Sequence, residues 1–270
     1  MSKKKAKEDA LLQYQKGKRF IDVGDFDSAL KPLLFAQQFF KQSNEYAIYA
    51  DICRLLGELF FNKGNYIESR NFYKKAYFSF KTYGNKIGMA DCYDQIALSF
   101  LLQDELKHAE DYQLRALKIR NDTPDKKGQA RALKNLAVIT YKKNGSADKA
   151  LPLLEEALSL AQKSKDPRLV VSIALNHSKI ASKKGDFSSA MKSFIVARRF
   201  SKKYAIPLTQ EDDKDFGTLL LNLGLQKYDE GDLQNSLNYL KKAVVILQAY
   251  NDPLLPLIKQ TITKIEKLLS

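Results

Sequence analysis

The sequence is poor in the residues that build metal centres, disulfide frameworks and many active sites. Its 270 residues include two cysteines, two histidines and no tryptophan. Cys53 and Cys92 have no clustered partner ligands, so we expect buried free thiols rather than a metal site or a disulfide. His108 and His177 belong to no pattern that joins a nucleophile to a base and an orienting acid. We therefore expect a protein that is not an enzyme and that uses no metal and no cofactor.

Helix breakers and long apolar runs are also scarce. Twelve glycines and seven prolines in 270 residues predict an almost entirely helical chain. No stretch approaches about twenty uninterrupted apolar residues, which argues against a membrane-spanning helix. The basic start, MSKKKAKEDALL, runs into an amphipathic pattern without the apolar core of a secretion signal, so we expect a cytoplasmic location.

Acidic residues are under-represented in the middle of the chain. The formal net charge is +14, and residues 101–200 hold 20 Lys and Arg against 11 Asp and Glu. Such a basic stretch attracts an acidic protein, a nucleic acid or an anionic membrane surface. Composition leaves these three partners open.

What the sequence does contain is one unit of about 40 residues written six times. A small residue recurs in its first helical segment at steps of 40, 40, 40, 41 and 46 residues: Gly17, Gly57, Ala97, Ala137, Ser178 and Gly224. A turn follows at Gly24, Gly64, Asp104, Gly145, Gly185 and Gly231. The second segment has a small residue followed seven positions later by alanine: Ala36, Ala76, Ala116, Ala157, Ala197 and Ala243. Small residues at these spacings predict pairs of closely packed helices, which stack because one pair cannot bury its apolar stripe alone.

Two phrases, LGELFFNKGNYIESRNFYKKA and HSKIASKKGDFSSAMKSFIVA, resemble the tetratricopeptide repeat family. The resemblance covers residues 10–250. The period is longer than the usual tetratricopeptide value of about 34 residues. In this longer period the sequence is similar to the repeats of kinesin light chains, LGN-type scaffolds and bacterial Rap proteins. The resemblance implies an all-α, right-handed superhelical solenoid of six helix pairs followed by a capping helix.

The repeat boundaries predict the domain organisation. We expect a basic flexible lead over residues 1–9, six repeats and a capping helix over residues 251–270. The repeats are expected at residues 10–45, 46–85, 86–127, 128–165, 166–204 and 209–250. Thr209 and Asp212 have the spacing of a capping box at the start of the sixth repeat.

The resemblance also indicates a binding surface. In stacked helix pairs the first helices line the concave face, and the residue two before each small residue is expected to point into it. These positions include Gln95, Asn135, Asn176 and Asn222. The three asparagines resemble the ladder by which kinesin light chain, LGN-type and O-GlcNAc transferase superhelices hold a peptide backbone, which an amide can do by donating and accepting together. The competing interpretation is three solvated surface asparagines.

Charged residues flank the ladder positions. Repeats two and three place Asp51, Arg54, Glu58, Asp91 and Asp94 there, whereas repeats four and five place Arg131, Lys134, Lys142, Lys179 and Lys183 there. The hypothesis is a groove that is acid-leaning toward its N-terminal half and basic in repeats four and five. It would favour an acidic segment over Arg131, Lys134 and Lys179. A solvated charged face is the alternative.

These observations predict a non-enzymatic scaffold or adaptor that binds an extended peptide or a helix of another protein in its groove. One alternative is a Rap-like, peptide-sensing regulator. We expect no further output domain within the nine residues before the first repeat. A second alternative is a nucleic-acid-binding repeat that uses the basic middle repeats. The sequence also allows self-association through an end repeat, where apolar surface is exposed.

Overall fold

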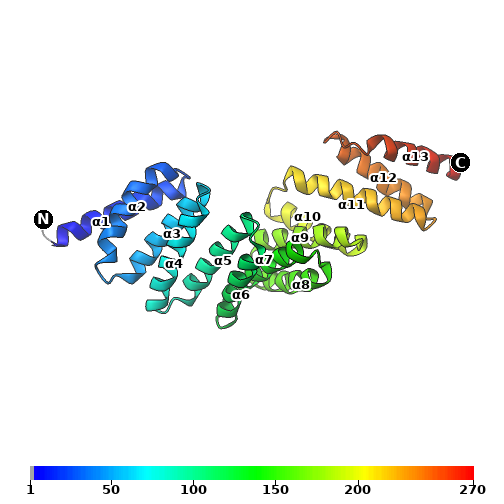
Figure 1. Cartoon of the computed structure of the whole chain (residues 1–270). Helices are drawn as coiled ribbons and strands as arrows, with labels where there is room; N and C mark the ends of the chain where they lie inside the picture. Colours follow the sequence, from blue (N-terminus) through cyan, green and yellow to red (C-terminus); the bar gives the residue numbers. More distant parts are fainter. Residues whose placement is uncertain (1–2) are drawn as a thin grey trace. The chain divides into compact units, whose positions relative to one another are not determined.

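The computed structural model describes residues 3–270, and every regular element in that range is an α-helix. The first seven helices are α1 (Lys3–Asp22), α2 (Phe26–Lys41), α3 (Tyr46–Asn62), α4 (Tyr66–Thr82), α5 (Lys86–Leu102), α6 (Leu106–Asn121) and α7 (Lys126–Asn144). The others are α8 (Ala147–Lys163), α9 (Pro167–Lys184), α10 (Phe187–Tyr204), α11 (Gln210–Asp229), α12 (Leu233–Gln248) and α13 (Leu255–Leu269). Helices α1 to α12 follow the six predicted repeats two by two, and α13 is the predicted final helix, which confirms the all-α repeat fold (Figure 1).

The chain divides into two compact units. The first runs to Asn144 and contains α1 to α7, and the second runs from Gly145 to Ser270 and contains α8 to α13. The division falls in the turn of the fourth predicted repeat, between its first and its second helix. Each unit has its own apolar core.

The turns between paired helices have a common construction. Glycine adopts a positive φ at the end of the first helix, as at Gly64 and Gly231, a conformation that costs glycine little. In four of the six turns the side chain of the next residue caps the second helix by accepting a hydrogen bond from the backbone N–H three residues on: Asp25, Asn65, Asp186 and Asp232. In the third repeat Asp104 takes the glycine position with a φ of 60°. The repeated Gly-Asp and Gly-Asn pairs therefore end one helix and start the next.

The small residues lie where paired helices touch. A Cβ added at Gly57 would come within 3.0 Å of the Tyr73 ring, so a larger residue there would force the helices apart. Across the same contact the Ser69 hydroxyl donates to the Gly57 carbonyl over 2.8 Å. The last repeat has the same bond, from Ser236 to Gly224 over 2.7 Å. The alanines seven positions later are fully buried: Ala36, Ala76, Ala116, Ala157, Ala197 and Ala243.

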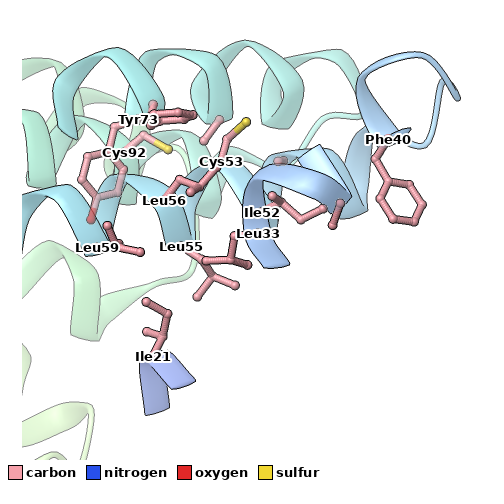
Figure 2. Packing of buried hydrophobic residues seen from close by; sticks show 14 of the residues in the cluster. Ile21, Leu33, Phe40, Ile52, Cys53, Leu55, Leu56, Leu59, Tyr73 and Cys92 are labelled. Atoms are coloured by element: carbon pink, nitrogen blue, oxygen red, sulfur yellow. The ribbon is translucent and has the colours of Figure 1, made fainter. Parts of the chain in front are cut away.

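The core of the first unit is one cluster with side chains from α1 to α5, and Figure 2 shows some of these side chains. Leu33, Ile52 and Leu56 are fully buried within it. Cys53 and Cys92 also lie in this cluster as free thiols, which confirms that part of the sequence prediction. Burial raises the pKa of Cys53 to about 11 and raises that of Cys92 as well.

The ends of the repeat array differ in detail from the expected boundaries. Helix α1 begins at Lys3, so residues 3–9 are helical rather than a flexible lead, and Lys7 forms an ion pair with Glu45 at 3.0 Å. Residues 1 and 2 lie outside the described range. The predicted capping box is present: Thr209 and Asp212 exchange hydrogen bonds at the start of α11. Helix α13 packs on α12 and buries Ile258 and Ile265.

Candidate functional site

The second unit contains a cleft between α9 and α11, which we call the second-unit cleft. Its volume is about 520 Å³. Helix α11 packs less extensively on the fifth repeat than earlier first helices pack on the repeats before them, and this leaves the space open. The polar lining consists of Arg168, Ser172, Asn176, Ser178, Lys179, Ser182, Lys183, Glu211, Asp212, Asp215, Thr218 and Asn222.

Two helical stripes supply most of these side chains. Positions 168, 172, 176, 179 and 183 of α9 are three or four residues apart, and so are positions 211, 215, 218 and 222 of α11. Residues at such spacings share one face of a helix. Asn176 and Asn222, which the sequence analysis selected, thus line one cleft together with Lys179 and Lys183. The same spacing, extended from the two asparagines, could have found Arg168, Ser172 and Thr218.

The floor of the cleft is apolar and includes one residue from the link between repeats five and six. Val171, Leu175, Phe194 and Leu219 come from helices, whereas Ile206 comes from the link. The link is anchored because the Ile206 N–H donates to the Ser201 carbonyl and the Ser201 hydroxyl donates to the Ile206 carbonyl. No periodic pattern in the sequence marks Ile206.

Lys179 joins the two sides of the cleft. Its ammonium group lies 2.7 Å from Glu211 and 3.1 Å from Asp215. The hydrogen bond to Glu211 raises the pKa of Lys179, and the same bond lowers the pKa of Glu211. Lys179 is a predicted site residue, whereas Glu211 and Asp215 are not, because capping and the helix dipole already account for an acidic cluster at a helix start.

The two asparagines differ in how they are engaged. Asn176 is half-buried and donates one N–H to the Ser172 carbonyl of its own helix at 2.9 Å. Its carbonyl oxygen and its second N–H are further hydrogen-bonding groups of the same amide. Asn222 is half-buried as well. Asn135 is half-buried on α7 and belongs to the first unit, so a ladder through all three asparagines stays a prediction.

The first unit has a smaller cleft of about 350 Å³, which we call the first-unit cleft. It is lined by Arg54, Glu58, Phe61, Asn62, Tyr73, Asp91, Gln95 and Arg131. The structure therefore brings together four residues that the sequence analysis selected, Arg54, Asp91, Gln95 and Arg131. Their charges are already paired, since Arg54 contacts Asp51 at 2.8 Å and Arg131 contacts Asp91 at 2.8 Å.

Asp94 does not lie on the groove surface as the sequence analysis expected. Its side chain is 4% exposed, and its carboxylate binds Arg120 at 2.5 Å and Gln113 at 2.7 Å. Arg120 is fully buried and also binds Asp91 at 2.7 Å and Asp125. A carboxylate enclosed in this way is unavailable to a ligand, so Asp94 is part of the interior of the fold.

The remaining selected residues lie on α7. Lys134 is half-buried, and burial lowers its pKa, with a smaller contribution from Arg131. Lys142 is exposed near the end of the helix. Lys134 and Lys179 belong to different units, so the basic groove through repeats four and five stays a prediction.

Comparison with known proteins identifies the fold. No family model and no curated protein matches the sequence. Among solved structures, the apo form of RapI is 15% identical over 96% of this chain and 97% of RapI, with a TM-score of 0.70. A Rap protein complexed with competence and sporulation factor is 14% identical, with a TM-score of 0.62 over 97% of this chain and 76% of that protein.

A third similar structure is described by name as having TPR-like repeats. It is a putative kinesin light chain of Podospora anserina with nearly identical TPR-like repeats, 13% identical over 72% of this chain and 95% of that one, with a TM-score of 0.57. The chain has a tetratricopeptide-like repeat fold. At these identities the similarity concerns the fold, and it agrees with the resemblance seen in the repeats.

A buried serine and a buried histidine of this TPR-like chain lie close together. The Ser193 hydroxyl lies 2.9 Å from Nδ1 of His177, and Nε2 of His177 lies 3.7 Å from Glu155. Both His177 and Ser193 are buried between α9 and α10, and burial lowers the pKa of His177.

Within residues 3–270 no group of three or more His, Cys, Asp or Glu side chains could hold a metal ion. In the same range no helix is long and apolar enough to cross a membrane.

Proposed function

We propose that this TPR-like chain is a non-enzymatic interaction module that binds an extended peptide segment of another protein in the second-unit cleft. The observation that supports the proposal most directly is the combination of the Asn176 and Asn222 amides with an apolar floor in one cleft of about 520 Å³. Clefts of a few hundred Å³ with an apolar lining and a few polar groups are typical of ligand sites. We also propose that the protein is cytoplasmic.

The amides and the floor divide the recognition between them. An asparagine can donate to a backbone carbonyl and accept from a backbone N–H, so it holds an extended chain whatever its side chains are. The floor around Leu175 and Ile206 would take an apolar side chain of the same segment. A Rap protein of similar fold is complexed with competence and sporulation factor, which supports ligand binding by this architecture.

Lys179 gives the site a preference in charge. An acidic side chain of the ligand would compete with Glu211 and Asp215 for this lysine, while Arg168 and Lys183 lie on the same stripe. We therefore infer that the ligand segment carries an acidic residue beside its apolar one. Within the first unit, we propose that a peptide-binding surface includes Gln95, Arg54, Asp91 and Arg131 of the first-unit cleft and Asn135, Lys134 and Lys142 of α7.

A random peptide library displayed on phage and selected against the folded protein tests the proposal. Selected peptides would then be titrated against wild type and against the double variant Asn176→Ala, Asn222→Ala. Loss of two hydrogen bonds of about 1 kcal/mol each predicts a fall in affinity of roughly 30-fold. The control is Gln234→Ala, which removes an exposed amide from the second helix α12 and should change affinity by less than about twofold.

Circular dichroism must first show equal helicity for the three proteins. Equal affinity of wild type and the double variant would place the peptide elsewhere on the surface. A selection that yields no peptide at all would overturn the peptide-binding proposal itself.

A peptide-sensing role is the second candidate, and the bridge from Lys179 to α11 favours it. A ligand that takes Lys179 away from Glu211 removes a contact between repeats five and six, and a ligand can shift a conformation only through such differential contacts. Hydrogen exchange with and without a selected peptide tests the idea. Faster exchange in residues 210–216 on binding would support a sensor, whereas slower exchange throughout α9 and α11 would indicate a static adaptor.

A further inference from the structure

Helix α10 carries a basic outer face that the peptide-binding proposal does not use. Its sequence, FSSAMKSFIVARRFSKKY, contains five cations and no acidic residue. The side facing the core buries Ala190, Phe194 and Ala197. All five cations are exposed: Lys192, Arg198, Arg199, Lys202 and Lys203.

These cations are unpaired, unlike others in the same unit. Lys179, Lys184, Lys214 and Lys227 each lie within 4 Å of a carboxylate. In the described part of the chain none of the five α10 cations forms an ion pair, and three of them lie beside an aromatic ring, as where Arg198 lies 5.6 Å from the Phe216 ring centre. A solvated helix face with mixed charges does not have this composition, because opposite charges on neighbouring turns stabilise a helix. Unpaired cations of one sign instead favour an anionic partner.

The cations form a track along the helix. Lys192, Arg199 and Lys203 are separated by seven and four residues, a spacing that places them on one face, and Lys202 borders them. At a rise of 1.5 Å per residue the track is about 16 Å long. A track of this kind follows a chain of negative charges better than it surrounds a single anion.

The aromatic residues beside the track distinguish among anionic partners. Tyr204 is 46% exposed at the end of the helix, with the Lys203 ammonium 5.2 Å from its ring centre. An exposed aromatic ring next to backbone-binding cations is the combination that holds a nucleobase by stacking. Membrane insertion is disfavoured, because the apolar face of α10 is packed in the core and Ile195 is the large apolar residue left exposed on this face. We propose that the outer face of α10 binds single-stranded nucleic acid.

Salt dependence measures the number of cations involved. Fluorescence anisotropy with a labelled thymidine 15-mer, repeated over a range of salt concentrations, gives the slope of log K against log salt. Four contacts from Lys192, Arg199, Lys202 and Lys203 predict a slope of about −2.8. The triple variant Arg199→Gln, Lys202→Gln, Lys203→Gln should reduce it to about −0.7 and weaken binding at least tenfold. Glutamine forms helix nearly as well as arginine and lysine, so the fold should be retained.

A matched variant separates the track from net charge. Replacing the exposed lysines Lys149, Lys163 and Lys242 of α8 and α12 by glutamine removes the same total charge and should leave the slope near that of wild type. Tyr204→Leu should weaken binding of the 15-mer about fivefold or more, the effect of losing one stacked base. It should leave binding of an abasic strand of equal length unchanged.

Several results would overturn the proposal. These are no binding of the 15-mer by wild type, equal losses in the two triple variants, or equal losses of the 15-mer and the abasic strand on Tyr204→Leu. Equally tight binding of polyglutamate of the same charge would assign the face to an acidic protein. Equally tight binding of phosphatidylserine vesicles would assign it to a lipid surface.

Discussion

Replacing Arg120 by methionine should strongly destabilise the first unit. Arg120 is fully buried between three carboxylates, and Asp94 among them is 4% exposed. Methionine retains much of the volume but removes the closest cation from the buried Asp94 carboxylate, which keeps only the more distant contact with Arg131 at 3.7 Å. Breaking a buried pair from one side costs about 3–5 kcal/mol, which corresponds to a fall in melting temperature of roughly 6–20 °C.

Urea denaturation of the full chain, followed by far-UV circular dichroism, measures the change. The control is Arg115→Met, which breaks an exposed ion pair with Asp111, both side chains being 54% exposed. That variant should lose less than about 1 kcal/mol. A loss of less than about 1 kcal/mol in Arg120→Met as well would refute the assignment of Arg120 as a required counter-ion.

The pH dependence of the same variant gives an independent check. Burial raises the pKa of Asp94, and removal of Arg120 should raise it further. A carboxyl whose folded-state pKa exceeds its unfolded-state value binds more protons when folded, so its destabilising effect shrinks as pH falls. The deficit of Arg120→Met should therefore be smaller at pH 5 than at pH 7. Adding Asp94→Asn should recover part of the lost stability of Arg120→Met at pH 7. If the double variant recovers none, the loss does not come from the Asp94 charge.

Three further predictions concern packing and titration. Gly224→Leu should cost about 1–3 kcal/mol or more, because even a Cβ at this position would come within 2.7 Å of Leu240; urea denaturation measures it. Burial lowers the pKa of His177 in the folded protein. Below a pH of about 6.5 the unfolded state therefore binds more protons at this residue than the folded state does. The free energy of unfolding should fall on acidification from pH 7. His177→Gln should flatten that dependence. Cys53 and Cys92 should react with a thiol reagent at pH 8 only after unfolding, because both are buried and burial raises their pKa values.

The first two of these predictions have matched control variants. Leu225→Ala changes a residue that is 40% exposed on the same helix as Gly224 and should cost less than about 1 kcal/mol. His108→Gln replaces the exposed histidine of α6 and is the matched variant for His177→Gln. Rapid labelling of either cysteine in the native protein would contradict the burial of the thiols.

The repeat architecture could be predicted because its determinants are local and repeated. The glycine at the turn, the capping residue after it and the small residues at helix contacts recur at a fixed period, so each repeat is evidence for the next. Asp104 shows how robust the pattern is, since it adopts a positive φ in the position that glycine holds elsewhere. The capping box of Thr209 and Asp212 was predictable because its two residues are local, only three positions apart.

The site could be predicted only in part, because side chains from other helices decide which groove residues are available. Asn176 and Asn222 follow from the repeat register, and both line the second-unit cleft. Asp94 has the same kind of register, yet Arg120 reaches it from the last turn of α6 and holds it in the interior. Arg120 itself has the sequence position of an ordinary cation at a helix C-terminus. Such cross-helix pairing has no period, and neither has the anchored link that supplies Ile206.

The bond from Ser69 to Gly57 in the second repeat recurs from Ser236 to Gly224 in the sixth. A few contact and turn positions per repeat therefore specify much of the fold, and the same kinds of residue recur at these positions along the chain. Exposed positions outside this set can diverge with little loss of the architecture. This pattern explains how such a fold persists in chains that share few identical residues, and why the outer faces and the groove can evolve separately from the scaffold.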